Sequence, residues 1–162
     1  MPDLTIKIYL KIILLISGIS LISAYYIEYV LGHQPCNLCL IERIPYGLSI
    51  ILIIINFVLN KNEKFIILLL TLIFIFSLTI SIYHFGIEQN FFQESPVCGL
   101  KDAVDIISKE EILKQLNKKS ISCKDVTFRI FGFSLTAINI IISLLLIIIS
   151  IKAQVNHEKK RY

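Results

Sequence analysis

The sequence predicts an all-α membrane protein, a bundle of four transmembrane helices with one long loop that contains a short amphipathic helix. Three observations support this fold class. Of the 162 residues, 56% are hydrophobic and only 17% are charged, which is more apolar surface than a soluble domain of this size could bury. Four apolar runs approach the length of about 20 residues that crosses a hydrocarbon core as a helix. The lysines fall between these runs, where they indicate topology and not a nucleic-acid surface.

The predicted spans belong to one integral membrane domain, 1–162, and cover about 12–30, 40–59, 65–85 and 128–151. The first run follows two lysines and could also be interpreted as a secretory signal peptide. Its apolar stretch is longer than usual for such a signal, and cleavage near Ala24 would leave the topology unchanged. The second run is too short to cross if it is counted from Pro45, so its helix is predicted to start near Leu38. A proline inside this helix would remove one backbone hydrogen bond and allow a kink.

Orientation follows from the basic residues near the span ends. With four spans, the N-terminal lysines, those in the turn at 60–64 and the basic tail fall on one side, which we predict to be cytoplasmic together with both termini. The two loops on the other side cover about 31–39 and 86–127. These loops hold all the cysteines, which are Cys36, Cys39, Cys98 and Cys123. Their placement indicates an oxidising compartment, where disulfides persist.

The long loop contains a candidate helix of its own. The segment Ser108–Glu111 resembles a capping box, and Ile112, Leu113 and Leu116 follow with a spacing that suits one apolar helix face. A short helix lying on the membrane surface fits this pattern. A solvated loop helix fits it equally well.

Cys36 and Cys39 carry the clearest chemical signal, because two cysteines separated by two residues can close a small and easily reduced disulfide. A structural disulfide is the plain alternative, although so small a loop would stabilise the fold little. Half of a zinc site is another alternative, but the other two cysteines do not form the second close pair that completes such sites. Spacing and topology together favour a redox role.

Arg43 follows Cys39 by four residues, which places both on one face of a helix that includes them. A guanidinium keeps its charge at every relevant pH and would favour a charged sulfur. An interfacial anchor is the alternative role for Arg43. On residue patterns alone, Cys98 and Cys123 are equally well explained as a structural bridge, and His84 is best explained as an interfacial residue without a role.

Several segments resemble the disulfide-bond-formation protein B (DsbB) family. Pro35–Arg43 (PCNLCLIER) is similar to the family's proline, cysteine-pair and arginine motif. Tyr83–Gln89 (YHFGIEQ), the loop with the two distant cysteines and Phe131–Asn139 (FGFSLTAIN) are also similar. The resemblance extends from Leu31 to Asn139. The related vitamin K epoxide reductase fold places its close pair late in the chain, whereas here the pair follows the first span.

The resemblance implies a protein-dithiol:quinone oxidoreductase of the bacterial inner membrane, with periplasmic loops. Such an enzyme passes electrons from a DsbA-type thioredoxin-fold oxidase in the periplasm to a membrane quinone, ubiquinone or menaquinone. The implied partners are therefore that oxidase, the quinone pool and the lipid bilayer. Neither a metal nor a nucleic acid is expected.

The resemblance also implies roles for individual residues. The partner's thiolate would attack Cys98 in a Cys98–Cys123 disulfide, and exchange would move the electrons to the Cys36–Cys39 disulfide. Cys39 would form a charge-transfer complex or adduct with the quinone, and Cys36 would resolve it. Arg43 would stabilise the thiolate charge. His84 falls near the sequence position of a family histidine that is close to the quinone, and it is a further candidate for cofactor binding.

Two rival functions make different predictions. A non-enzymatic membrane protein, whose cysteines form structural disulfides or bind a metal, predicts that replacing Cys39 or Arg43 leaves the redox state of a partner unchanged. An enzyme working in reverse would deliver reducing equivalents outward. Its partner would then accumulate in the reduced form.

Overall fold

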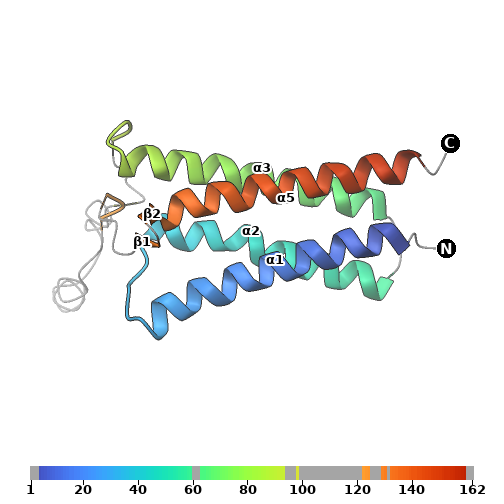
Figure 1. Ribbon diagram of the computed structural model, residues 1–162, viewed down its shortest axis with the longest axis horizontal. Coiled ribbons are helices and arrows are strands. Elements are labelled where there is room, and N and C mark those ends of the chain that lie inside the picture. The colour runs from blue at the N-terminus through green and yellow to red at the C-terminus, as the bar shows by residue number, and fades with distance from the viewer. Residues whose placement is uncertain are drawn as a thin grey trace, which may run out of the picture.

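The computed structural model describes residues 4–59, 63–93, 98, 122–124, 129–130 and 132–159. Four long helices dominate it, as Figure 1 shows: α1 (Leu4–Tyr29), α2 (Asn37–Leu59), α3 (Glu63–Glu88) and α5 (Leu135–Lys159). Each is long and apolar enough to cross a membrane. This confirms the predicted four-helix membrane protein.

The start of α5 differs from the prediction. Its helix begins at Leu135 and not near residue 128, because a two-stranded hairpin precedes it. β1 (Arg129–Ile130) pairs antiparallel with β2 (Phe133–Ser134). Gly132 has φ +87°, a left-handed conformation that glycine adopts without strain. The Ser134 hydroxyl then accepts a hydrogen bond from the amide of Ala137 at 3.2 Å, as a helix N-cap does.

The predicted loop helix at 108–116 lies outside the described residues. Within the described part of the chain, the hairpin is the one departure from helix among the regular elements. Both termini lie at one end of the bundle, and the hairpin lies at the other (Figure 1). This arrangement fits an even number of spans.

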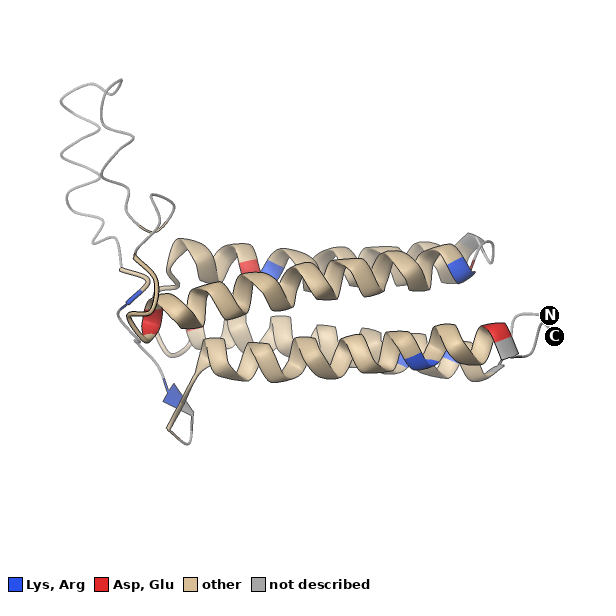
Figure 2. Ribbon diagram, turned by 90° about the horizontal axis from the view of Figure 1, so that it is seen from above, with Lys and Arg blue, Asp and Glu red and all other residues tan. Residues whose placement is uncertain are grey.

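The surface of the bundle suits a lipid environment. Figure 2 shows the charged residues gathered mainly toward the helix ends, so that most of the bundle's length is uncharged, as the cost of charge in hydrocarbon requires. Many large apolar side chains are exposed along the helices. Small polar residues are buried between them instead, and these allow close helix packing: Ser17, Ser49, Ser77, Ser81, Ser143 and Ser150.

The helices do not pack equally. α3 packs most extensively against α5, whereas α1 diverges from the other helices toward the hairpin end (Figure 1). An apolar core forms mainly in the half of the bundle nearer the termini, where Leu10, Ile53 and Leu70 are fully buried. In the other half, a cavity lies between α1, α2 and α5. Cys36, which precedes α2, and Cys39, in its first turn, lie at this end.

Candidate functional site

Cys36 and Cys39 lie at the N-terminal end of α2. The carbonyl of Cys36 accepts the amide of Leu40 at 3.2 Å, and its Sγ accepts the amide of Cys39 at 3.3 Å. Cys36 therefore caps the helix, and this cap fixes both sulfurs near its positive dipole end. The two Sγ atoms are 2.8 Å apart, so little movement separates the dithiol from the disulfide.

His84 of α3 connects this pair to a buried carboxylate. Its Nε2 lies 3.5 Å from Cys36 Sγ, and its Nδ1 lies 3.0 Å from Glu42 Oε1. Only 2% of His84 is exposed. A protonated imidazole can donate to the thiolate and the carboxylate at once. The three residues thus form a chain of polar groups that starts at the cysteine pair and enters the bundle.

Cys36 lies just outside the membrane-spanning part of α2. A hydrogen bond from the Cys39 thiol lowers the pKa of Cys36 to about 5, with further help from His84, although burial opposes the shift. Cys36 is therefore a thiolate at neutral pH when the pair is reduced. A thiolate is the reactive form in disulfide exchange.

Hydrogen bonds continue from Glu42 to α5. Asn139 Nδ2 donates to Glu42 Oε2 at 3.1 Å and to Ser81 Oγ at 2.7 Å. The hydroxyl of Tyr46 donates to Asn139 Oδ1. Thr136 Oγ1 lies 3.4 Å from His84 Nδ1, the same ring nitrogen that contacts Glu42. Glu42 thus has partners on both oxygens, which offsets part of the cost of burying a carboxylate.

The other two cysteines form a disulfide, Cys98–Cys123. Both are buried, and they share one apolar cluster with Cys36, Leu38 and Ile87. The cysteine that caps α2 therefore lies in the same cluster as the loop disulfide. The structure brings the four predicted redox cysteines together at one end of the bundle.

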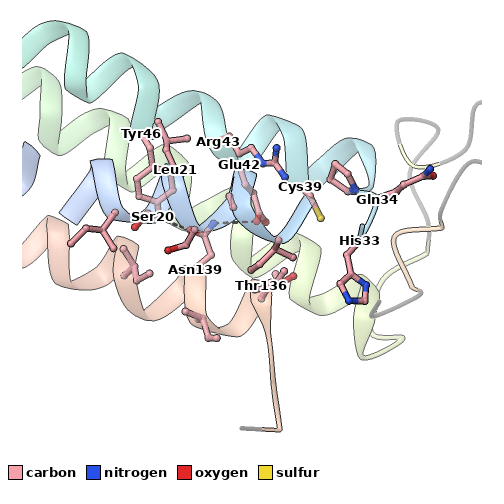
Figure 3. Close-up of a pocket in the computed structure, with 18 residues that line it drawn as sticks. Ser20, Leu21, His33, Gln34, Cys39, Glu42, Arg43, Tyr46, Thr136 and Asn139 are labelled. Carbon is pink, nitrogen blue, oxygen red and sulfur yellow. Dashed lines mark hydrogen bonds between the residues drawn. The ribbon is translucent and has the colours of Figure 1, made fainter. Parts of the chain in front are cut away.

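The cavity between α1, α2 and α5 has a volume of about 280 Å³. Its walls are mostly apolar, and Ile19 in the α1 wall is 56% exposed, so the cavity reaches the surface of the bundle. Figure 3 shows Cys39 and Glu42 of α2 facing Thr136 and Asn139 of α5, with Arg43 also on α2. Its size is near the lower end of the range for small-molecule sites.

Arg43 lines this cavity together with Cys39, as expected for residues one helical turn apart. Its guanidinium pairs with the carboxylate of Glu28 and lies 5.0 Å from the ring centroid of Tyr25. The side chain is mostly buried between α1 and α2. These contacts hold a fixed positive charge at the cavity wall.

The structure separates Cys39 and His84, two residues that the family resemblance assigns to quinone binding. Cys39 lines the cavity, whereas His84 is not among its lining residues and contacts Cys36. Contact between His84 and a quinone stays a prediction. His84 instead contacts the sulfur of Cys36, which is not among the residues that line the cavity.

The buried polar network as a unit was not predicted from the sequence. Glu42 and Asn139 both fall within segments that resemble the DsbB family, but the sequence predicts no individual role for either residue. A signal was present in the spacing, because Ser77, Ser81 and His84 fall on one face of α3, and an ionisable residue in a membrane helix is by default a functional candidate. The spacing does not show which other helices pack against this face of α3.

The chain is similar to known proteins over most of its length. The family of the disulfide bond formation protein DsbB matches residues 7–153. A disulfide bond formation protein B of Acinetobacter baumannii is 24% identical over 144 residues, covering 85% of this chain and 84% of that protein. An uncharacterized protein of Rickettsia prowazekii is 27% identical over 144 residues, covering 88% of this chain and 84% of that protein. No solved structure matches the chain.

Proposed function

The chain belongs to the DsbB family of membrane proteins for disulfide bond formation, and we propose that it reoxidises a DsbA-type dithiol oxidase and passes the electrons to a membrane quinone. Membership in the family implies oxidoreductase activity in disulfide formation. The proposal adds the electron donor, the acceptor and the roles of the residues. It also places the protein in the bacterial inner membrane, with both termini cytoplasmic and the cysteines on the periplasmic side.

One observation carries the proposal. Cys36 lies in the cluster that contains the Cys98–Cys123 disulfide, while Cys39 lines the cavity between the helices. The close pair thus adjoins both the proposed electron donor and the proposed acceptor site, and Cys39, which also packs against the disulfide cluster, lies next to both. A structural disulfide would need neither neighbour.

The first steps are thiol–disulfide exchanges. A partner thiolate attacks Cys98, forms a mixed disulfide and releases Cys123 as a thiolate. Because Cys98 is only 4% exposed, this attack requires Cys98 to become accessible when the partner binds. The second partner thiol then displaces Cys98, and the partner leaves oxidised.

The electron pair then moves to the close pair. The Cys123 thiolate attacks Cys36, the Cys36–Cys39 bond breaks, and Cys39 leaves as a thiolate in the cavity. Cys98 next displaces Cys36, which restores the Cys98–Cys123 disulfide and leaves the close pair reduced. The low pKa of Cys36 makes it a good leaving group in this last step. Stabilising the reduced form also makes the close pair a stronger oxidant of the loop cysteines.

The residues of the cavity fit a quinone. The walls are apolar enough for its ring and lipid tail, while Arg43 and the amide of Asn139 offer polar groups for its oxygens. A bound quinone supplies oxidation of the dithiol, because it accepts two electrons and two protons. Arg43 would favour the thiolate form of Cys39, and the His84–Glu42 pair would hold a proton beside Cys36.

A reconstituted assay tests the proposal. The purified protein is mixed with a reduced DsbA-type oxidase and either ubiquinone or menaquinone, and quinone absorbance and partner redox state are followed together. We expect one quinone reduced per partner dithiol oxidised, with loss of turnover in Cys36→Ser and Cys98→Ser. Quinone reduction at the wild-type rate by either variant would refute the proposed route. A partner that becomes reduced instead would support the reverse reaction.

A further inference from the structure

We propose that the reduced form of this protein binds one thiophilic divalent cation, Zn²⁺ in the first instance, through Cys36, Cys39 and His84. The bound cation would hold the close pair in the dithiol state. The metal-binding part of this inference is independent of the proposed function. Its consequence, a block of electron transfer, rests on that function.

The ligand atoms already stand close together. Both Sγ atoms and a ring nitrogen of His84 lie within 4.8 Å of one another. Tetrahedral zinc bonds place a sulfur and a nitrogen about 3.6 Å apart and two sulfurs about 3.8 Å apart. The Cys36 Sγ to His84 Nε2 distance is 3.5 Å, while the two sulfurs, at 2.8 Å, must separate by about 1 Å. Rotation of Cys39 toward the cavity would provide that separation.

The surroundings of His84 also suit a metal ligand. Metal-binding histidines commonly donate their second ring N–H to a carboxylate, which fixes the ring and raises its basicity. His84 presents Nε2 to Cys36 and Nδ1 to Glu42 at 3.0 Å. Glu42 is itself held by Asn139. The sequence offered only half of a zinc site, and the fold supplies the missing ligand from α3 with its supporting carboxylate.

The cavity provides an entry route for the ion and room for a water molecule as its fourth ligand. Cys39 lines it, so a cation that enters there meets one ligand directly and can retain a water molecule. The close pair must be reduced, because a disulfide has no thiolate to offer. Binding releases the remaining thiol protons and transfers no electrons. Both sulfurs are then occupied, and neither can attack a disulfide or donate to an acceptor.

Cobalt binding tests the inference directly, because tetrahedral Co²⁺ bound to thiolates has intense visible absorption. The full chain with Cys98→Ser and Cys123→Ser keeps only the close pair and is reduced with a phosphine that is then removed. We expect one Co²⁺ per chain, displaced by Zn²⁺, and no binding after oxidation. His84→Ala should weaken affinity at least about tenfold and Glu42→Gln about 10- to 100-fold. His157→Ala, in the last turn of α5 and so at the end of the bundle away from the cysteines, should leave the affinity unchanged.

X-ray absorption of the zinc-loaded protein provides a readout that needs no further variant. We expect two sulfurs at about 2.3 Å and at least one nitrogen at about 2.0 Å. Absence of binding, equal binding by the oxidised protein, or a first shell without sulfur would overturn the inference. Metal-free protein without these loop substitutions is assayed for quinone reduction in parallel. Turnover without metal binding would refute this inference alone, and metal binding without turnover would refute the proposed function alone.

Discussion

The two halves of the helix bundle bury different kinds of side chains. Toward the termini, the helices meet through fully buried aliphatic residues such as Leu10, Ile53 and Leu70. Toward the cysteines, they meet through a carboxylate and an imidazole, Glu42 and His84. Apolar contacts stabilise a fold without specifying chemistry, whereas buried ionisable groups are costly and persist where their chemistry is used. The comparison indicates that one half supplies stability and the other supplies function.

The largest effect should follow from removing the sulfur in the cavity. Cys39→Ser is expected to lower the rate of quinone reduction at least about 10³-fold, because a hydroxyl cannot replace the thiolate as an electron donor. Its effect on the free energy of unfolding should stay within about 1 kcal/mol. Stopped-flow quinone absorbance and denaturation in detergent measure the two quantities. If the rate of quinone reduction and the free energy of unfolding both fell strongly, the two halves of the bundle would not differ in their roles.

The opposite result is expected in the other half. Leu70→Ala should lower the free energy of unfolding by about 2–5 kcal/mol, because it leaves a cavity in the aliphatic core. The rate of quinone reduction per folded molecule should change less than about threefold. Denaturant titration in detergent, with activity scaled to the folded fraction, checks this. A selective loss of turnover would show that the core also tunes the site.

His84→Gln tests the electrostatics of the cysteine half in the metal-free reduced protein. The imidazole helps to hold the pKa of Cys36 at about 5, so its removal should raise that pKa toward the ordinary value of about 8.5. Ultraviolet thiolate absorbance against pH measures the shift, and His157→Gln is the control. An unchanged midpoint would mean that His84 does not stabilise the thiolate.

The same pKa sets a pH dependence for stability. Between pH 5 and the pKa of an unfolded thiol, the unfolded reduced chain binds more protons than the folded one, so stability rises with pH. The contribution is complete above the unfolded pKa and is lost as the pH falls through about 5. Denaturation of the reduced protein at several pH values should show this slope, and His84→Gln should flatten it.

Two asparagines of α5 give the finest comparison. Asn139 donates to Glu42 and Ser81, while Asn156 donates to the Tyr9 hydroxyl at 3.1 Å in the terminal half. Asn139→Ala should slow quinone reduction about tenfold, because it leaves a buried carboxylate short of a donor. Asn156→Ala should cost about 1 kcal/mol of stability and leave the rate unchanged. Equal effects of the two substitutions on the rate of quinone reduction would contradict a specific role for Asn139 in the site.

The sequence predicted the membrane architecture well because apolar length is a local property of each run. The start of the last helix was predicted too early, because the apolar run continues back past residue 132. Gly132, which forms a turn, and Ser134, which caps the helix, mark its true start. The cysteine and arginine roles were expected from a local motif. The contact of Glu42 with His84 depends on how α2 and α3 pack, and no local pattern encodes it.

The close pair adjoins two different environments, and this arrangement affects how such a protein can be re-engineered. Cys36 is buried with the loop disulfide, whereas Cys39 packs against that cluster and also lines the cavity, which neither Cys98 nor Cys123 lines. The proposed partner site and the proposed quinone site therefore adjoin at the close pair but differ in their other residues. Residues of the loop can then be exchanged to accept a new partner without touching the acceptor. Residues of the cavity can likewise be tuned to a new oxidant without altering the partner surface.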